Sequence, residues 1–492
     1  MHYIQGTNRS EIKLFSEVEN WVDINNPVRL IDLIINKIVL SNPKEFIWKG
    51  QSKTGRKSYS PITMLKLFLY GYLNKIPSSR RLEAETYRNV ELMWLIKELH
   101  PDHWTICEYR RENKEHIRFV TIEFRKFLKT EGYIEGKEVA TDGSKFKAYA
   151  AKEMLSLKNI KKRLERLNAK LEEYLEEFKY ADTIDELTEE FADNFEGSEI
   201  NKVLIDKIAD LQEQVSKLIF QKEQLENTEK DYLAPNDPDA NLMKSRDGWI
   251  PGYNGQTVID KKNKMIAIAE ITTQANDINE LKKNIDNLKE QLNIEPEIIE
   301  ADKGYANINE IKEIEDNSKT KCYIPLPENK KKKDDKKNGI SFIYNKKNDE
   351  YECSQGKTLK LKQRNKKKRK SFYNIYQCED CENCPLKPKC TKSKKGRIIH
   401  RNNNQDWSDK YKERIKGTQA LTKNKERKTI VEHPFGTIKW IMGKLHFILT
   451  GKDKVQTEFN LYTTVYNFKR LINIDNMELL LKKAENYDWE RS

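Results

Sequence analysis

The most regular hydrophobic pattern in the chain lies between residues 153 and 228. Apolar residues recur there at alternating steps of three and four, which places them along one side of an α-helix. The pattern stops around Asp182–Ser198 and then resumes, so it predicts two helices that pack as an inserted antiparallel coiled-coil hairpin. The two stripes are Leu157, Ile160, Leu164, Leu167, Leu171, Tyr174 and Phe178, then Leu204, Ile208, Leu211, Val215, Leu218 and Leu225.

Residues 1–130 also show helical patterns. Ser60-Pro61 is typical of a helix start, and Thr105–Glu108 fits a capping box that opens a short helix. This helix carries Tyr109, Arg110, Arg111 and Lys114, a basic face containing an aromatic ring. Such a helix suits binding in a DNA groove, as in helix-turn-helix proteins. A solvated helix end in a helical domain explains the same residues equally well.

Two strand-like runs end in aspartate. Glu138–Asp142 precedes Gly143, and Pro296–Asp302 precedes Lys303-Gly304. A carboxylate at the carboxyl end of a buried strand faces the crevice where α/β sheets bind ligands, although Asp before Gly is also ordinary turn chemistry. Between the runs, residues 250–273 predict a β-hairpin and residues 277–292 a helix. This order predicts an α/β fold with an RNase H-like mixed sheet.

The segment Lys428–Lys439 reads KTIVEHPFGTIK and contains one carboxylate, Glu432. On a helix, Glu432 and Lys439 lie two turns apart on the same face, about 10 Å along the axis. A carboxylate that can bind a divalent metal ion would then share a face with a cation that can bind a phosphate.

Composition favours a polyanionic partner. The chain of 492 residues has 91 Lys plus Arg against 78 Asp plus Glu, a net charge of +13. Nucleic acid is the partner that this excess favours, although an AT-rich genome would also raise the lysine content. No run approaches 18 apolar residues and no amino-terminal signal segment follows Met1, so we expect a cytoplasmic protein without a membrane partner.

Residues 326–400 form a basic, cysteine-rich insertion. The lysine blocks at 330–333, 336–337 and 366–370 are typical of solvated, partly disordered chain, and they could instead contact phosphates. Five of the seven cysteines fall here, and the two-residue spacings suit a tetrahedral metal ion. We expect a structural Zn²⁺ bound by four of five thiolates; reduced thiols without metal are the alternative. The favoured ligands are Cys378, Cys381, Cys384 and Cys390, with Cys353 able to replace one.

Three segments together resemble the DDE transposases of bacterial insertion sequences, closest to the IS1182-like group of the IS4/IS5-like superfamily. They are Thr141–Ser144, Ala301–Tyr305 and Val431–Lys439. The resemblance extends over residues 25–115 and 237–254, so it covers most of the chain. One departure concerns the Tyr and Arg that the family places seven and four residues before the glutamate. Lys425 and Lys428 stand there, and Arg427 is one residue out of register, so their roles stay unassigned.

The resemblance implies that Asp142, Asp302 and Glu432 bind two Mg²⁺ or Mn²⁺ ions, about 3.5–4 Å apart, and that Lys439 positions a phosphate. It implies binding of terminal inverted repeats and target DNA, strand cleavage and strand transfer, and action as a homo-oligomer. A nuclease that cuts without joining, or a non-catalytic DNA-binding descendant, stays open as an alternative. The expected division is 1–130 (helical, DNA-binding), 131–152, 229–325 and 401–480 (catalytic core), 153–228 (hairpin) and 326–400 (zinc-binding).

Overall fold

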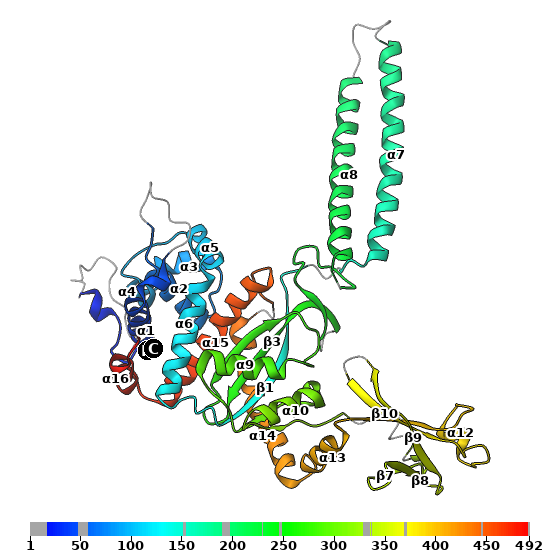
Figure 1. The fold of residues 1–492 in the computed structure, drawn as a ribbon. Helices are drawn as coiled ribbons and strands as arrows, with labels where there is room; N and C mark the ends of the chain where they lie inside the picture. Colours follow the sequence, from blue (N-terminus) through cyan, green and yellow to red (C-terminus); the bar gives the residue numbers. More distant parts are fainter. Residues whose placement is uncertain are drawn as a thin grey trace, which may run out of the picture.

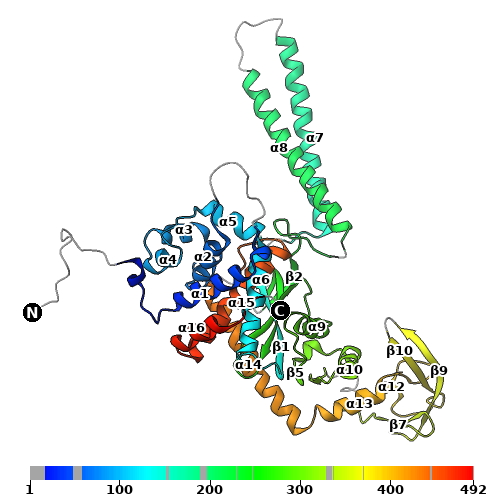
Figure 2. The same ribbon diagram turned by 60° about the vertical axis from the view of Figure 1, so that its left-hand side comes forward.

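The computed structural model describes residues 17–47, 58–150, 154–188, 197–228, 230–245, 248–327, 335, 337–368, 371–443 and 446–490. A helical body and a mixed sheet lie side by side, and a long helical hairpin and a small second sheet extend from them in different directions (Figures 1 and 2). The mixed α/β architecture agrees with the predicted fold class. No described helix is long and apolar enough to cross a membrane.

The amino-terminal helices share one core with the carboxyl-terminal helices. Leu30, Phe68 and Phe124 belong to the same buried cluster as Phe468 and Trp489. The helices are α1 (Pro27–Ser41), α2 (Pro61–Leu73), α3 (Ser79–Thr86), α4 (Val90–Leu95), α5 (His103–Glu112), α6 (Lys114–Thr130), α15 (Lys452–Ile474) and α16 (Met477–Asn486). The amino-terminal and carboxyl-terminal helices are therefore held together by packing, with α16 against α1 and α15 against α2 and α6.

The central sheet is mixed, with the order β2-β3-β1-β5-β6 and β4 paired to β3. Its strands are β1 (Glu138–Lys147), β2 (Asn241–Ser245), β3 (Gly248–Asp260), β4 (Ile266–Thr272), β5 (Ile298–Glu300) and β6 (Lys321–Tyr323). β3 runs antiparallel to β1, β2 and β4, whereas β5 runs parallel to β1 and β6. The parallel crossovers contain α9 (Leu281–Leu292) and α10 (Ile308–Asn317), as parallel pairing requires.

The predicted hairpin is present as α7 (Leu157–Thr188) and α8 (Gly197–Glu226), which extend side by side away from the body (Figure 1). Leu204, Leu211, Leu218 and Leu225 are the buried leucines of α8, one every seven residues. At the base of the hairpin, Leu155 and Leu233 exchange backbone hydrogen bonds of 2.8 and 2.9 Å. The segment therefore leaves and re-enters the body at one point.

The cysteine-rich segment folds as a second, antiparallel sheet of order β11-β10-β9-β8-β7. Its strands are β7 (Phe342–Asn345), β8 (Glu350–Cys353), β9 (Thr358–Lys368), β10 (Ser371–Cys378) and β11 (Ile398–Asn402), with α12 (Lys387–Cys390) before β11. The expectation of partial disorder is wrong for residues 366–368, because they pair with β10. Residues 330–333 lie outside the described part of the chain.

Two helices return the chain from this second sheet to the first. They are α13 (Gln405–Arg414) and α14 (Thr418–Met442), and α14 contacts β1, β3, β5 and β6. The segment that was expected to be helical around Glu432 is thus the middle of a 25-residue helix.

Candidate active site

Asp142 and Asp302 are brought together by the register of two parallel strands. Ala140 pairs with Glu300 as the last partners of β1 and β5, so each aspartate stands two residues beyond that pair. Parallel neighbours present equivalent positions at the same edge of a sheet. Asp302 then caps a short 3₁₀ turn, and its carboxylate accepts a hydrogen bond of 2.6 Å from the Gly304 amide.

The predicted turn after Asp142 is absent. β1 continues to Lys147 because β3 remains its antiparallel partner after β5 has ended, with Asp142 opposite Thr257. Asp142 therefore has a paired strand on one side and an open edge on the other. This open edge is where Asp302 lies.

The electrostatic environment of Asp142 reflects this placement. Burial raises the pKa of its carboxyl to about 6; the Arg427 guanidinium opposes the rise, and the nearby carboxylates of Asp302 and Asp277 add to it. Arg427 comes from α14, and its Nη1 lies 3.8 Å from Oδ2 of Asp142. The residue that stood one position out of register in the sequence is thus the one that α14 directs at this carboxylate.

α14 runs along β1 in the same direction. Lys423 pairs with Glu138 at the start of the strand, Arg427 with Asp142 in its middle, and the Phe435 ring lies 6.2 Å from the Phe146 ring near its end. Buried residues on one side of α14, such as Ile430, Val431 and Ile438, keep this face against the sheet.

Glu432 and Lys439 lie elsewhere on α14. Glu432 is exposed, and among the described residues it forms no hydrogen bond or ion pair with Asp142 or Asp302. It follows Arg427 by five residues, which turns it about 140° around the helix axis from the face that meets the sheet. Lys439 is half-buried, with Nζ 5.5 Å from the centroid of the Phe146 ring. Two of the three expected carboxylates are therefore adjacent, and the third is apart from them.

Asp277 also lies near these carboxylates, although no sequence pattern selected it. It lies in the loop between β4 and α9, and one of its oxygens accepts hydrogen bonds from Asn254 and Gln256 at 2.7 and 2.8 Å. Six of the eight residues in this loop, 273–280, are polar, so only the folded structure distinguishes this aspartate.

The donor set fits a hard divalent cation. Carboxylate oxygens are the ligands that Mg²⁺ and Mn²⁺ prefer, and among the described residues the ion pairs of these three carboxylates are Asp277 with Lys145 and Asp142 with Arg427. The backbone leaves room for them, since a Cβ on Gly304 would stand 2.7 Å from Oδ1 of Asp302. No group of three or more His, Cys, Asp or Glu among the described residues is close enough to hold a metal ion as it stands.

The four residues expected to contact DNA divide into two pairs. Tyr109 and Arg110 are buried, with exposed fractions of 0% and 2%, so neither can reach DNA in this structure. Arg110 donates hydrogen bonds to the Tyr72 hydroxyl and the Pro77 carbonyl. The prediction for these two is wrong because long-range contacts turn them inward.

Arg111 and Lys114 stand at the surface side of the same region. Arg111 is exposed and pairs with Glu112, and Lys114 begins α6 and pairs with Asp453 at 2.8 Å. The helix start is corrected as well: Asp102, not Thr105, caps α5, and its carboxylate accepts the Thr105 amide at 2.8 Å.

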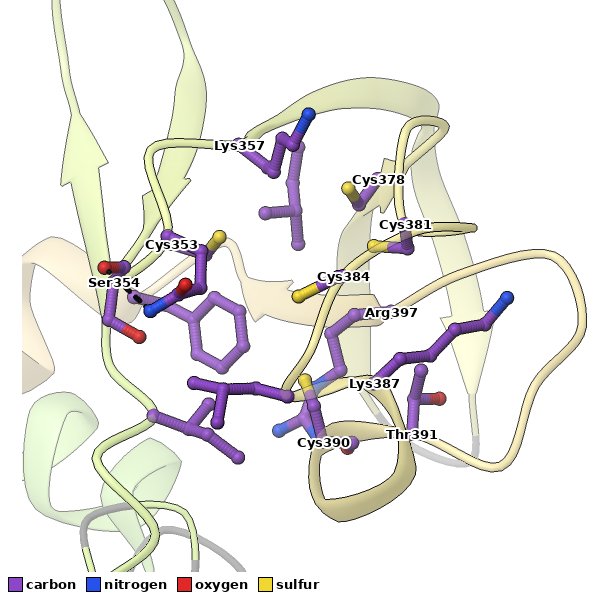
Figure 3. A pocket seen from close by; sticks show the side chains of 15 residues that line it. Cys353, Ser354, Lys357, Cys378, Cys381, Cys384, Lys387, Cys390, Thr391 and Arg397 are labelled. Carbon is purple, nitrogen blue, oxygen red and sulfur yellow. Dashed lines mark hydrogen bonds between the residues drawn. The ribbon is translucent and has the colours of Figure 1, made fainter.

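All five cysteines of the second sheet line one small cavity (Figure 3). Cys353 ends β8, Cys378 ends β10, Cys381 and Cys384 follow in the loop, and Cys390 ends α12. Burial raises the pKa of the Cys378 thiol, and the hydrogen bond that this thiol donates to Cys381 adds to the rise, so the thiol is neutral without a cation nearby. The five cysteines thus line the same cavity, but no three His, Cys, Asp or Glu among the described residues are arranged to hold a metal ion.

Comparison with protein families gives two matches. Residues 352–472 match the family model described as "Transposase DDE domain", and residues 16–112 match the one described as "Transposase domain (DUF772)". The first match contains Glu432, Lys439 and the five clustered cysteines but neither Asp142 nor Asp302. Both matches support a DDE transposase, an enzyme class that cuts and transfers DNA.

No curated protein matches the chain. One solved structure does, described as "Cryo-EM structure of piggyBac transposase synaptic complex with hairpin DNA (SNHP)". The two chains are 9% identical, the match covers 94% of this chain and 80% of that chain, and the TM-score is 0.32. A likeness at this level carries no argument about the fold or the site.

Proposed function

We propose that the chain is the transposase of a bacterial, IS1182-like insertion sequence. It binds the terminal inverted repeats and catalyses metal-dependent DNA cleavage and strand transfer. The observation that carries this proposal is the adjacency of Asp142 and Asp302, each two residues beyond the Ala140–Glu300 pair. The two transposase-domain matches support the same class.

The sheet order supports an RNase H-like catalytic core. Three antiparallel strands in the order β4-β3-β1, followed by the parallel strands β5 and β6, are what that fold requires. The first acidic residue of such a centre comes from the central strand and the second from its parallel neighbour. The helical region that contains Arg111 would bind the DNA ends, in a homo-oligomer that holds two ends in the cytoplasm at the nucleoid.

In this proposal Asp142, Asp302 and Glu432 hold Mg²⁺ or Mn²⁺. When bound, these ions activate the attacking water or 3′-hydroxyl and stabilise the leaving oxygen. Glu432 is exposed on α14 in this structure, so its part in the site requires a local rearrangement of α14 beyond Arg427 in the DNA complex. Lys439 positions a phosphate, and Arg427 balances the charge of Asp142 from the sheet side of the helix.

Cleavage of labelled transposon-end DNA with Mg²⁺ or Mn²⁺ tests the proposal. Asp302→Asn keeps the size of the side chain and removes its charge, so cutting and 3′-end joining should both disappear. Asp286→Asn is the matched control, because Asp286 is an exposed aspartate on α9 outside the centre. Cutting that survives in Asp302→Asn would mean that the active site is elsewhere.

The products separate the other classes. An RNase H-like nuclease would give cut DNA and no joined product, and a non-catalytic descendant would bind the end DNA without cutting it. Joined products that depend on Asp302 exclude both.

A structural Zn²⁺ is the second part of the proposal, held by four of the five clustered cysteines with Cys378, Cys381, Cys384 and Cys390 favoured. Support comes from the convergence of all five on one cavity. A Zn²⁺ with four thiolates has no open position, so its role is to stabilise the second sheet. Purified protein should contain one zinc per chain, lost in the double variant Cys378→Ser with Cys381→Ser, which leaves only three of the five thiolates, and retained in Cys107→Ser, whose cysteine is exposed on α5. Equal zinc content in both variants would contradict this site.

A further inference from the structure

Asp277 is held in a fixed orientation by donors from two strands. Its Oδ1 accepts from Nδ2 of Asn254 at 2.7 Å, from Nε2 of Gln256 at 2.8 Å and from Nζ of Lys145 at 3.3 Å. Asn254 and Gln256 are buried, so neither amide has a competing water. Three donors on one oxygen fix the direction of the other, Oδ2.

The donors are themselves oriented by neighbours of the two aspartates. Oε1 of Gln256 accepts from the Tyr305 hydroxyl at 2.5 Å and from Asn284 at 3.2 Å, so its Nε2 has to face Asp277. Asn284 also donates to Oγ1 of Thr141 at 2.9 Å. Thr141 adjoins Asp142, and Tyr305 belongs to the turn that Asp302 caps, so the buried network that orients Asp277 reaches residues beside both other aspartates.

Two glycines make the space that this arrangement needs. A Cβ on Gly143 would stand 2.4 Å from Oδ1 of Asp277 and 2.8 Å from Oδ1 of Asn254. A Cβ on Gly304 would stand 3.4 Å from Oδ2 of Asp277 and 2.7 Å from Oδ1 of Asp302. Oδ2 of Asp277 is therefore on the side of Asp302.

The cluster also contains an acceptor that is buried and unused. Oδ1 of Asn254, a residue with no exposed surface, accepts no hydrogen bond from the described residues. A buried acceptor without a donor costs about 1–3 kcal/mol unless a water or an ion meets it. This oxygen lies near the carboxylate of Asp277, and a water molecule bound to a cation there would donate the missing hydrogen bond.

We propose that Asp277 is a third aspartate of the metal centre, whose Oδ2 holds the divalent cation together with Asp142 and Asp302. The inference rests on the proposed function, because it concerns the same cation. It adds one ligand to the expected set, because the sheet and its loops then supply three carboxylates without Glu432 of α14. Lys145 neutralises Asp277 only through Oδ1, which leaves the other oxygen for the ion.

Manganese binding by the full-length chain tests the inference without DNA. Isothermal titration with Mn²⁺ should show affinity about 10- to 100-fold weaker in Asp277→Asn than in wild type. Lys145→Gln is the matched control, because it removes the partner of Asp277 and keeps the carboxylate. It should bind Mn²⁺ at least as tightly as wild type. Thermal unfolding without metal establishes that both variants fold.

Two results would overturn the inference. One is wild-type affinity in Asp277→Asn. The other is an equal loss in Lys145→Gln, which would make Asp277 a structural partner of the lysine. Failure of the proposed function is distinguishable, since it would appear as absent DNA cleavage by a wild-type chain whose Mn²⁺ binding still depends on Asp277. A wild-type chain that binds no Mn²⁺ would refute the inference directly.

Discussion

Replacing Lys423 with methionine tests how α14 is attached to the sheet. Nζ of Lys423 lies 2.5 Å from Oε2 of Glu138 and 3.8 Å from Oε1 of Glu300. The Glu300 side chain is 2% exposed, and neither of its oxygens accepts a hydrogen bond from the described residues. Lys261 pairs with Glu138 and with Glu426 of α14, both at 2.7 Å. Lys423 is thus the nearest cation to a buried carboxylate.

The expected loss of stability follows from that burial. Removing one partner of a buried pair costs about 3–5 kcal/mol, because the other charge is left without compensation. Lys261 remains in the variant, and Glu138 is one-third exposed. Glu300 can take up a proton when its partner is gone, which limits its share to about 1.4 kcal/mol for the one pH unit between its pKa of about 7 and pH 8, so we expect a total loss of about 1–2 kcal/mol at pH 8.

The loss should depend on pH. Burial raises the pKa of Glu300 to about 7 in the folded protein, against an ordinary value of 4.5, and Lys423 is the strongest influence that lowers it. The folded state therefore binds this proton more tightly than the unfolded state, so Glu300 costs stability as pH rises from about 4.5 to 7. Without Lys423 its pKa rises further. The deficit of Lys423→Met should be full at pH 8 and small at pH 5.

Native-state hydrogen exchange of the α14 and β5 amides measures this, with rates corrected for the intrinsic effect of pH. A second variant, Lys423→Met with Glu300→Gln, removes the charge that the methionine leaves unpaired and should recover most of the protection at pH 8. Equal protection of Lys423→Met and wild type at pH 8 would refute the reasoning. So would a deficit that is the same at both pH values.

Two further predictions use matched substitutions. Gly143→Ala should destabilise the protein by about 1–3 kcal/mol, because its Cβ would lie closer than 3.0 Å to three polar atoms. Gly436→Ala, which has open space around it inside α14, should stabilise the protein by about 0.5–1 kcal/mol. Thermal unfolding compares the two variants. Arg111→Gln should leave stability unchanged and reduce the slope of log K against log salt concentration for end-DNA binding by about 0.9 in magnitude. Arg110→Gln should instead destabilise the helical body by about 3 kcal/mol, because Arg110 is buried. Unchanged stability in Arg110→Gln would contradict this buried role.

The sequence was sufficient to predict features that depend only on local residue patterns and on the direction of the backbone. Apolar runs that end in Asp142 and Asp302 predict two parallel strands, and parallel pairing then brings the two side chains together. The seven-residue repeat of α8 predicts its packing against α7 for the same reason. Local period and strand direction are properties of short segments, so one sequence is enough to read them.

Side chains whose partners are distant in sequence could not be placed this way. Arg110 is charged, and charged residues are usually found at the surface. It is buried here because it donates hydrogen bonds to Tyr72 of α2 and to Pro77 in the loop after α2. Asp277 lies in a polar loop, and its importance follows from Asn254 and Gln256 on β3.

The second sheet was missed for a related reason. Its lysines alternate with residues that pack on the opposite face of β9, and buried Leu359 and Tyr376 supply a small core across two strands. The contiguous lysines at 366–368 concealed that alternation, because they break the two-residue period at the end of β9.

The hairpin of α7 and α8 sets a length scale for the whole assembly. Its second helix has 30 residues, which corresponds to about 45 Å, or the rise of about 13 base pairs of duplex. Both arms return to the single bridge between Leu155 and Leu233, close to the strand that carries Asp142. A duplex bound at the outer end of α8 would therefore lie more than one turn of DNA away from this bridge. Adding or removing a heptad in both arms would change that separation by about 10 Å and leave the sheet untouched.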